Sequence, residues 1–167
     1  MLGTSAEVVR EVQAVEAMTE PEAREFLEES YVIHFGVIAD GEPYVTPMSF
    51  VVDGDRLLFR TKPGRRFSAL ESQPVVSLEA CHFDADTGDW KSVIVRGTAT
   101  EVTDEETVQK THDLLFQKYE QAMGSLLARG EEPGLPLTPH AFAVSIGQIS
   151  GRVSGRGFSL PTRPGRF

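Results

Sequence analysis

The chain is poor in cysteine and lacks long apolar runs, which excludes two kinds of structure. The 167 residues include one cysteine, Cys81, so an intramolecular disulfide is impossible, and such usage is typical of a reducing compartment. No apolar run reaches about 18 residues, so no transmembrane helix and no membrane partner are expected. Residues 1–13 lack the apolar segment of a signal peptide. We therefore expect one domain, residues 1–167, in the cytoplasm.

Positive charge is also scarce. The chain has 16 Lys and Arg against 25 Asp and Glu, a net charge of −9, which argues against nucleic acid as a partner. The basic residues are unevenly placed, because five of them fall within residues 56–66 and four arginines fall in the acid-free tail 152–167. In an acidic chain, the cluster at 56–66 indicates an anion site.

The hydrophobic pattern predicts mainly β structure with added helices. Six strands are expected, and Asp-Gly turns join the first three into an antiparallel meander: 31–39, 43–52, 55–61, 74–83, 90–102 and 140–149. Helices are expected at 5–18 and 19–30, which together form an N-terminal helical segment 1–30, and at 64–72 and 103–129. Gly97 predicts a bend or a bulge. The six strands fit a small antiparallel β-barrel with a helical insertion at 103–129 and an irregular basic tail at 152–167.

The strongest local motif is T-K-P-G-R-R-F-S at residues 61–68. It leaves a strand, turns at Pro-Gly and enters a short helix, whose N-terminus offers free N–H groups and a positive dipole end. Three cations, Lys62, Arg65 and Arg66, suit a phosphate group at such a position. A solvated basic loop is the alternative.

The strand before this motif carries Pro47. Proline within a strand is confined to edges and bulges, where it leaves neighbouring backbone groups free to bind something other than a strand. A planar ligand could use those groups. An ordinary edge strand is the alternative.

Several segments in order resemble a known family: H-x-G-V-I-A-D-G-x-P-Y-V-T-P-M-S-F-V-V-D-G, then G-R-R-F-x-A-L, P-V-V-S-L-E and W-K-S-V-I-V-R-G-T-A-T-E-V. Over residues 20–155 the chain is similar to the FMN-binding split-barrel family related to pyridoxamine 5′-phosphate oxidase, and most to its nitroimidazole-resistance-like branch. The resemblance implies a six-stranded split β-barrel and a homodimer with FMN at the subunit interface. It places the FMN phosphate on Thr61, Lys62, Arg65, Arg66 and Ser68. It places the flavin ring on Pro47, Met48, Ser49, Phe50, Trp90, Ser92 and Val93.

The same resemblance implies an FMN-dependent oxidoreductase. In such enzymes the flavin carries the hydride, and the protein supplies orientation and electrostatics. NAD(P)H or another donor would supply electrons, and a nitroaromatic or a quinone would fit as a small planar acceptor. Oxidation of pyridoxamine phosphate itself is less expected, because no second phosphate-binding cluster is found apart from the arginines of the tail. The alternatives are a deazaflavin coenzyme, or a non-catalytic protein binding flavin or haem, with His34 or His140 as the axial haem ligand.

The remaining polar residues predict no further site. The four histidines show no metal-ligand spacing, so no metal centre is expected. The acidic run 84–89 lacks the closing Glu of a calcium-binding loop and is interpreted as a solvated turn. Cys81 lies within a predicted strand and is expected to be a buried, inert thiol.

Overall fold

The computed structural model describes residues 15–127 and 140–154. These residues form eight strands and three helices. In chain order the elements are β1 (Val15–Met18), α1 (Glu20–Glu29), β2 (Ile33–Ala39), β3 (Glu42–Met48), β4 (Val51–Asp53), β5 (Arg56–Thr61), α2 (Arg65–Ser72), β6 (Val75–Phe83), β7 (Trp90–Val102), α3 (Glu105–Leu127) and β8 (His140–Ser154).

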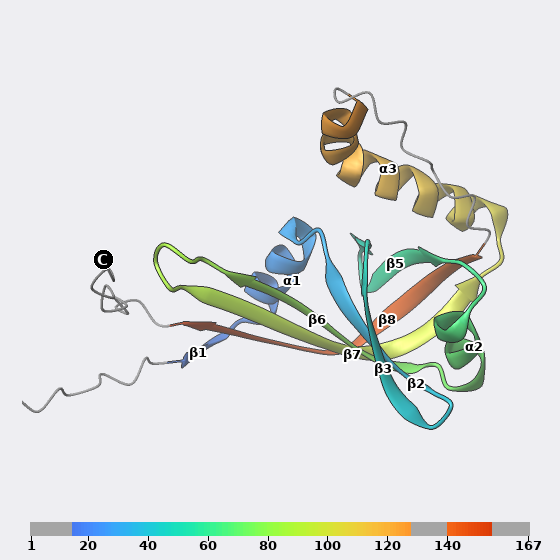
Figure 1. Ribbon diagram of the computed structural model, residues 1–167, viewed down its shortest axis with the longest axis horizontal. Coiled ribbons are helices and arrows are strands. Elements are labelled where there is room, and N and C mark those ends of the chain that lie inside the picture. Colours follow the sequence, from blue (N-terminus) through green and yellow to red (C-terminus); the bar gives the residue numbers. More distant parts are fainter. Residues whose placement is uncertain (1–14, 128–139, 155–167) are drawn as a thin grey trace, which may run out of the picture.

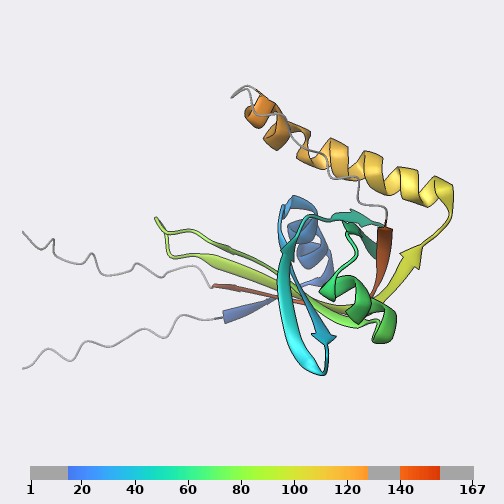
Figure 2. The same ribbon diagram turned by 45° about the vertical axis from the view of Figure 1, so that its right-hand side comes forward.

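The strands form one antiparallel sheet in the order β3-β2-β6-β7-β8-β5-β4, with β1 paired to β8. The end strands β3 and β4 do not pair with each other in the described part of the chain, so the strongly curved sheet stays open (Figure 1). A second view shows the β6–β7 hairpin projecting away from the curved end that carries α2 (Figure 2). The predicted split β-barrel with added helices is confirmed.

The predicted meander of three strands is wrong. Residues 43–52 do not form one strand, because the chain turns at Ser49–Phe50 and separates β3 from β4. Met48 and Phe50 are both buried, and Val51 then pairs with Leu58 of β5. The hairpins β2–β3 and β4–β5 therefore lie at opposite ends of the sheet order, and the sheet has eight strands where six were expected.

The predicted helix 5–18 is wrong at its end. Residues 15–18 form β1, which pairs with residues 151–154 of β8, and residues 1–14 lie outside the described residues. The helix propensity of these residues is overridden by their pairing with the sheet. Gly151 permits the pairing, since a Cβ there would lie 2.6 Å from the sulfur of Met18. The start of the predicted tail 152–167 thus belongs to the sheet, and residues 155–167 are not described.

The bulge predicted at Gly97 is confirmed. The register of β7 against β8 shifts between Arg96 and Gly97. A Cβ at position 97 would lie only 2.0 Å from the backbone oxygen of Ser145, so only glycine fits this close approach.

The helices follow their sequence signals. Thr19 and Glu22 form a capping box at the start of α1. Asp104 caps α3, because its carboxylate accepts the Thr107 N–H at 2.8 Å. No helix in the described ranges is long and apolar enough to cross a bilayer.

The interior of the barrel is built largely on aromatic side chains. Phe35, Phe59 and Phe142 are nearly fully buried, and their ring centroids lie 4.7 and 5.6 Å apart along this series. Phe67 of α2 packs against the same cluster, 5.8 Å from Phe142. The core therefore fixes α2 against the end of β5, where the cation-rich motif lies.

Candidate functional site

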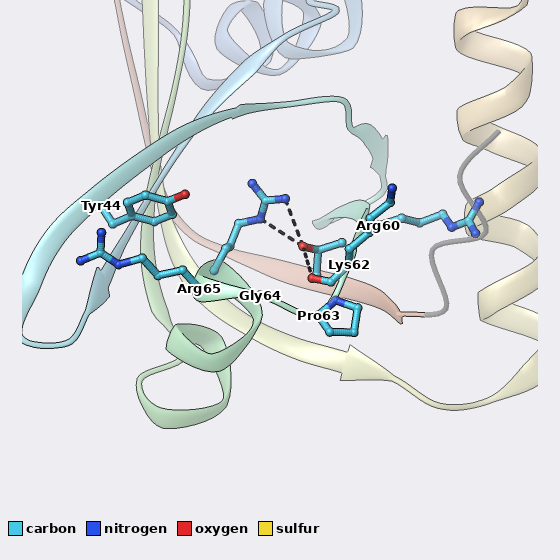
Figure 3. Close-up of a pocket in the computed structure, with 8 residues that line it drawn as sticks. Tyr44, Arg60, Lys62, Pro63, Gly64 and Arg65 are labelled. Atoms are coloured by element: carbon cyan, nitrogen blue, oxygen red, sulfur yellow. Dashed lines mark hydrogen bonds between the residues drawn. The ribbon is translucent and has the colours of Figure 1, made fainter. Parts of the chain in front are cut away.

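A pocket of about 380 Å³ lies at the junction of β5 and α2 (Figure 3). Its lining comes from β3, from the end of β5 and from the start of α2: Tyr44, Arg60, Thr61, Lys62, Pro63, Gly64, Arg65 and Arg66. Four of these are the residues predicted to hold a phosphate, Thr61, Lys62, Arg65 and Arg66. The structure therefore brings the core of the predicted anion site together in one pocket.

Gly64 gives this pocket an open helix terminus. Its φ of 155° and ψ of −170° form a conformation that is essentially restricted to glycine. No side chain caps α2, and a Cβ at position 64 would meet nothing within 4 Å. The first N–H groups of α2 are thus uncapped at an open surface, which favours an anion.

Arg66 is a half-buried cation held in place by hydroxyl groups. Its Nε and Nη2 donate to Thr61 Oγ1 at 3.2 and 3.0 Å, and its Nη1 donates to Thr46 Oγ1 at 2.5 Å. Burial lowers the pKa of Arg66 below its usual value, although a guanidinium stays charged at neutral pH. No carboxylate pairs with Arg66 in the described ranges.

Arg65 takes a different position from Arg66. Its guanidinium lies 4.8 Å from the centre of the Tyr44 ring, and Figure 3 shows the two side chains adjacent on one side of the pocket. Two exposed carboxylates, Asp40 and Glu42, lie 3.4 and 3.9 Å from it. Exposed pairs of this kind are weak, so Arg65 can exchange them for a ligand.

Prediction from sequence missed part of the pocket and misplaced one residue. Tyr44 was not assigned to the site, and Arg60 was counted in the cation cluster 56–66 but not among the phosphate-binding residues. Ser68 is exposed on α2 and does not line the pocket. A helix turn separates it from Gly64, whose carbonyl accepts the Ser68 N–H at 3.0 Å.

The segment Pro47–Phe50 begins at the end of the edge strand β3 and leads to β4. The predicted edge position of Pro47 is confirmed, since β3 ends the sheet order. Pro47 and Ser49 are exposed, whereas the side chains of Met48 and Phe50 are buried in the core. Only their backbone groups could contact a ligand.

Helix α3 holds the end of this segment. The hydroxyl of Tyr119 accepts the Phe50 N–H at 3.1 Å and donates to the Tyr31 carbonyl. Beside it, the Nζ of Lys118 is buried 4.2 Å from the Phe50 ring centre and has no hydrogen-bond partner among the described residues. Burial lowers the pKa of Lys118 to about 8.

Trp90, Ser92 and Val93 do not reach the pocket. Trp90 closes the β6–β7 hairpin opposite Phe83 and lines a separate cavity of about 590 Å³ with Met18 and Phe26. Val93 is fully buried in the core, so its side chain cannot face a ligand. Figure 2 shows this hairpin on the side of the molecule away from α2.

Ser92 belongs to a polar group on the sheet surface. Its Oγ donates to Glu79 Oε1 at 3.1 Å, and Glu79 Oε2 lies 2.9 Å from His34 Nδ1. His34 is the register partner of Pro47, so Ser92 and Pro47 lie over the same region of the sheet.

Cys81 is exposed on the same sheet surface, and the prediction of a buried thiol is wrong. Packing around its sulfur, together with the Glu79 carboxylate, raises the pKa of this thiol.

Comparison with known proteins identifies relatives of this chain. The family model described as pyridoxamine 5′-phosphate oxidase matches residues 19–153. A FAD-binding protein from Mesorhizobium loti has a similar structure, with a TM-score of 0.68 and 25% identity over 84% of this chain and 99% of that one. A proposed 5-nitroimidazole antibiotic resistance protein from Bacteroides thetaiotaomicron has a TM-score of 0.70 over 92% of this chain and 95% of that one, and at 15% identity it shares the fold.

One curated relative is similar over a shorter stretch. An uncharacterized protein of Rhizobium meliloti is 36% identical over 63 residues, which are 38% of this chain and 41% of that protein. The family model, by contrast, spans α1 through β8, and it includes both the β5–α2 pocket and the edge strand β3. The chain belongs to the pyridoxamine 5′-phosphate oxidase family.

Proposed function

We propose that this protein binds FMN and acts as a flavin-dependent oxidoreductase on a small planar acceptor. Arg66 carries the proposal. It is a half-buried cation, positioned by Thr61 and Thr46, that has no carboxylate partner in the described residues and lines an open pocket. Such a cation is prepared for an anion from outside the chain.

The donors of the pocket fit a phosphate monoester. Arg66 and Lys62 supply positive charge, and the uncapped start of α2 supplies backbone N–H groups. Arg65 adds a second guanidinium from beside Tyr44. The family membership and the FAD-binding relative from Mesorhizobium loti support a flavin as the molecule that carries the phosphate.

When bound, the flavin would supply hydride transfer, and the residues of this chain would bind and orient it. The backbone nitrogen of Pro47 has no hydrogen to donate, and this leaves the edge of β3 as a surface for a flat ring. The pocket is lined by cations, hydroxyl groups, Tyr44 and small residues. Among the described residues its lining holds no carboxylate–histidine pair, and hydride transfer by a bound flavin needs none. A nitroaromatic or a quinone matches this chemistry, with NAD(P)H as electron donor.

We also propose a homodimer in which a second copy completes the flavin site. Trp90 lies in a different cavity from Arg65 and Arg66, at the far end of the β6–β7 hairpin. In the proposed dimer, one flavin would contact the β5–α2 pocket of one copy and Trp90 of the other. In this arrangement Ser92 and Pro47 would also border the ring.

The first experiment identifies the cofactor. Purified protein should show the two visible absorbance bands of an oxidised flavin, and the mass of the extracted ligand should be that of FMN. Extraction of FAD would change the assigned cofactor from FMN to FAD, the flavin named for the Mesorhizobium loti relative. A deazaflavin mass or a haem spectrum would contradict the FMN proposal. Oxidation of NAD(P)H that depends on an added nitroaromatic or quinone would support turnover. If no acceptor promotes NAD(P)H oxidation, the protein binds the flavin without this activity.

The second experiment tests the dimer. Sedimentation should give a dimer, and FMN should quench tryptophan emission, which reports Trp90 alone because the chain has one tryptophan. The contrary result is a monomer that retains FMN, or emission that FMN does not change.

A further inference from the structure

The sheet surface carries a second cluster of reactive side chains, separate from the β5–α2 pocket. His34 of β2 and Glu79 and Cys81 of β6 each offer one ligand atom, and these atoms all lie within 4.8 Å of one another. No other group of this kind occurs in residues 15–127 and 140–154. We propose that His34, Glu79 and Cys81 form a binding site for Zn²⁺.

Strand geometry brings these residues together. Glu79 and Cys81 are two positions apart on β6, so alternation directs both side chains to one face. His34 is the direct register partner of Glu79, although the two are 45 positions apart in the chain. The site is thus built on paired strands, which hold side chains more firmly than loops do.

The set of donor atoms suits zinc. An imidazole nitrogen, a carboxylate oxygen and a thiolate sulfur are its usual protein ligands, and three of them leave a fourth position for water or another molecule. Tetrahedral bonds of the usual lengths separate ligand atoms by roughly 3.3–3.8 Å. The His34–Glu79 pair, at 2.9 Å, would therefore open slightly, and separations near 4.8 Å would close by about an ångström. Rotation about exposed χ angles provides both changes. On binding, the thiol of Cys81 would release its proton to water.

A supporting hydrogen bond is already in place. Ser92 Oγ donates to Glu79 Oε1 at 3.1 Å, and Oε2 faces His34 Nδ1 at 2.9 Å, so a Zn²⁺ ion bound by these two atoms would replace the hydrogen bond between them. Outer hydrogen bonds of this kind orient carboxylate ligands. The site draws no residue from a second copy. It adjoins the region where the proposed dimer would place the flavin ring, because Ser92 belongs to both, so Zn²⁺ binding is measured separately from FMN binding.

The test uses full-length protein after treatment with a chelator, and it titrates Zn²⁺ against a colorimetric competitor. One Zn²⁺ per chain is expected. His34→Gln, Glu79→Gln and Cys81→Ser should each weaken binding by at least about tenfold, and Ser92→Ala by about tenfold. The matched control is His140→Gln, because His140 Nδ1 pairs with Glu101 Oε1 at 2.6 Å without a thiol nearby. It should leave Zn²⁺ affinity unchanged.

Co²⁺ gives a second measurement that reports the sulfur ligand. A difference spectrum with Co²⁺ should show a thiolate-to-cobalt charge-transfer band that Cys81→Ser removes and His140→Gln retains. Absence of Zn²⁺ binding to folded wild-type protein would overturn the proposal. Binding that Cys81→Ser leaves unchanged, or that His140→Gln weakens equally, would also overturn it. Circular dichroism of each variant establishes that it is folded.

Discussion

Two half-buried cations lie at the ends of the segment 46–50, and their surroundings differ. Arg66 donates three hydrogen bonds to the hydroxyls of Thr61 and Thr46 and lines an open pocket. The Nζ of Lys118 lies against the ring of Phe50 and has no hydrogen-bond partner in the part of the chain that the structure describes. Burial lowers the pKa of both groups. Only Arg66 is both positioned and open to a ligand.

Because their surroundings differ, substitutions of Arg66 and of Lys118 should affect different properties, ligand binding in one case and stability in the other. A cation that is held by neutral hydroxyls keeps its charge available, because no internal anion neutralises it. A cation buried without a partner costs stability while it is charged. Removing Arg66 should therefore damage ligand binding, whereas removing the charge of Lys118 should stabilise the fold.

The largest effect is expected from Arg66→Met. It removes a charge-assisted contact worth roughly 1.5–3 kcal/mol, so FMN affinity should fall by about 10- to 100-fold. Fluorescence titration with FMN provides the measurement. Arg56→Met is the matched control, because Arg56 belongs to the same stretch of cations but pairs with Asp53 at 2.8 Å outside the pocket. Equal losses in both variants would show that net charge, rather than the pocket, controls affinity.

A gain in stability is expected from Lys118→Met. The pKa of Lys118 is about 8 in the folded chain, and an unfolded lysine titrates near 10.4. The unfolded chain therefore binds more protons between these values, and wild-type stability rises with pH across this window. At pH 7 the variant should gain about 1–2 kcal/mol, allowing for the part of the side chain that water reaches.

Denaturant melts across this pH range test that gain. The difference between Lys118→Met and wild type should shrink as the pH rises from 8 towards 10.4, because the lysine is then neutral in both states. A constant difference at all pH values would assign the effect to packing instead.

The smallest effect is expected from Thr61→Val. The buried hydroxyl of Thr61 accepts two bonds from Arg66, and valine keeps the shape without the oxygen. FMN affinity should fall by about 3- to 10-fold, and unfolding should cost about 1 kcal/mol less. Thr111→Val provides the comparison, since Thr111 is equally buried but bonds to the Thr107 carbonyl on α3. It should lower stability similarly and leave FMN binding unchanged.

The sequence allowed the pocket to be predicted because its residues are adjacent in the chain. Thr61, Lys62, Arg65 and Arg66 lie within one strand-to-helix turn, so local rules of turns and helix ends place them together. Tyr44 and Thr46 come from β3, and only the fold brings them to Arg66. The split barrel itself followed from strand signals and family resemblance.

Features that depend on strand register could not be predicted. The pairing of His34 with Glu79 depends on how β2 aligns with β6, and no local pattern specifies that alignment. The same limit explains why β1 was taken for the end of a helix, since its strand form depends on pairing with β8. The break of residues 43–52 into β3 and β4 likewise depends on burial of Phe50.

The central proposal is that the β5–α2 pocket holds the phosphate of FMN. Affinities for FMN and for riboflavin, which lacks the phosphate, test it most directly in wild type and in Arg65→Ala/Arg66→Ala. Wild type should prefer FMN, and the double variant should lose at least about tenfold in FMN affinity while riboflavin affinity changes little. An equal loss for both ligands, or no loss for FMN, would contradict a phosphate site in this pocket.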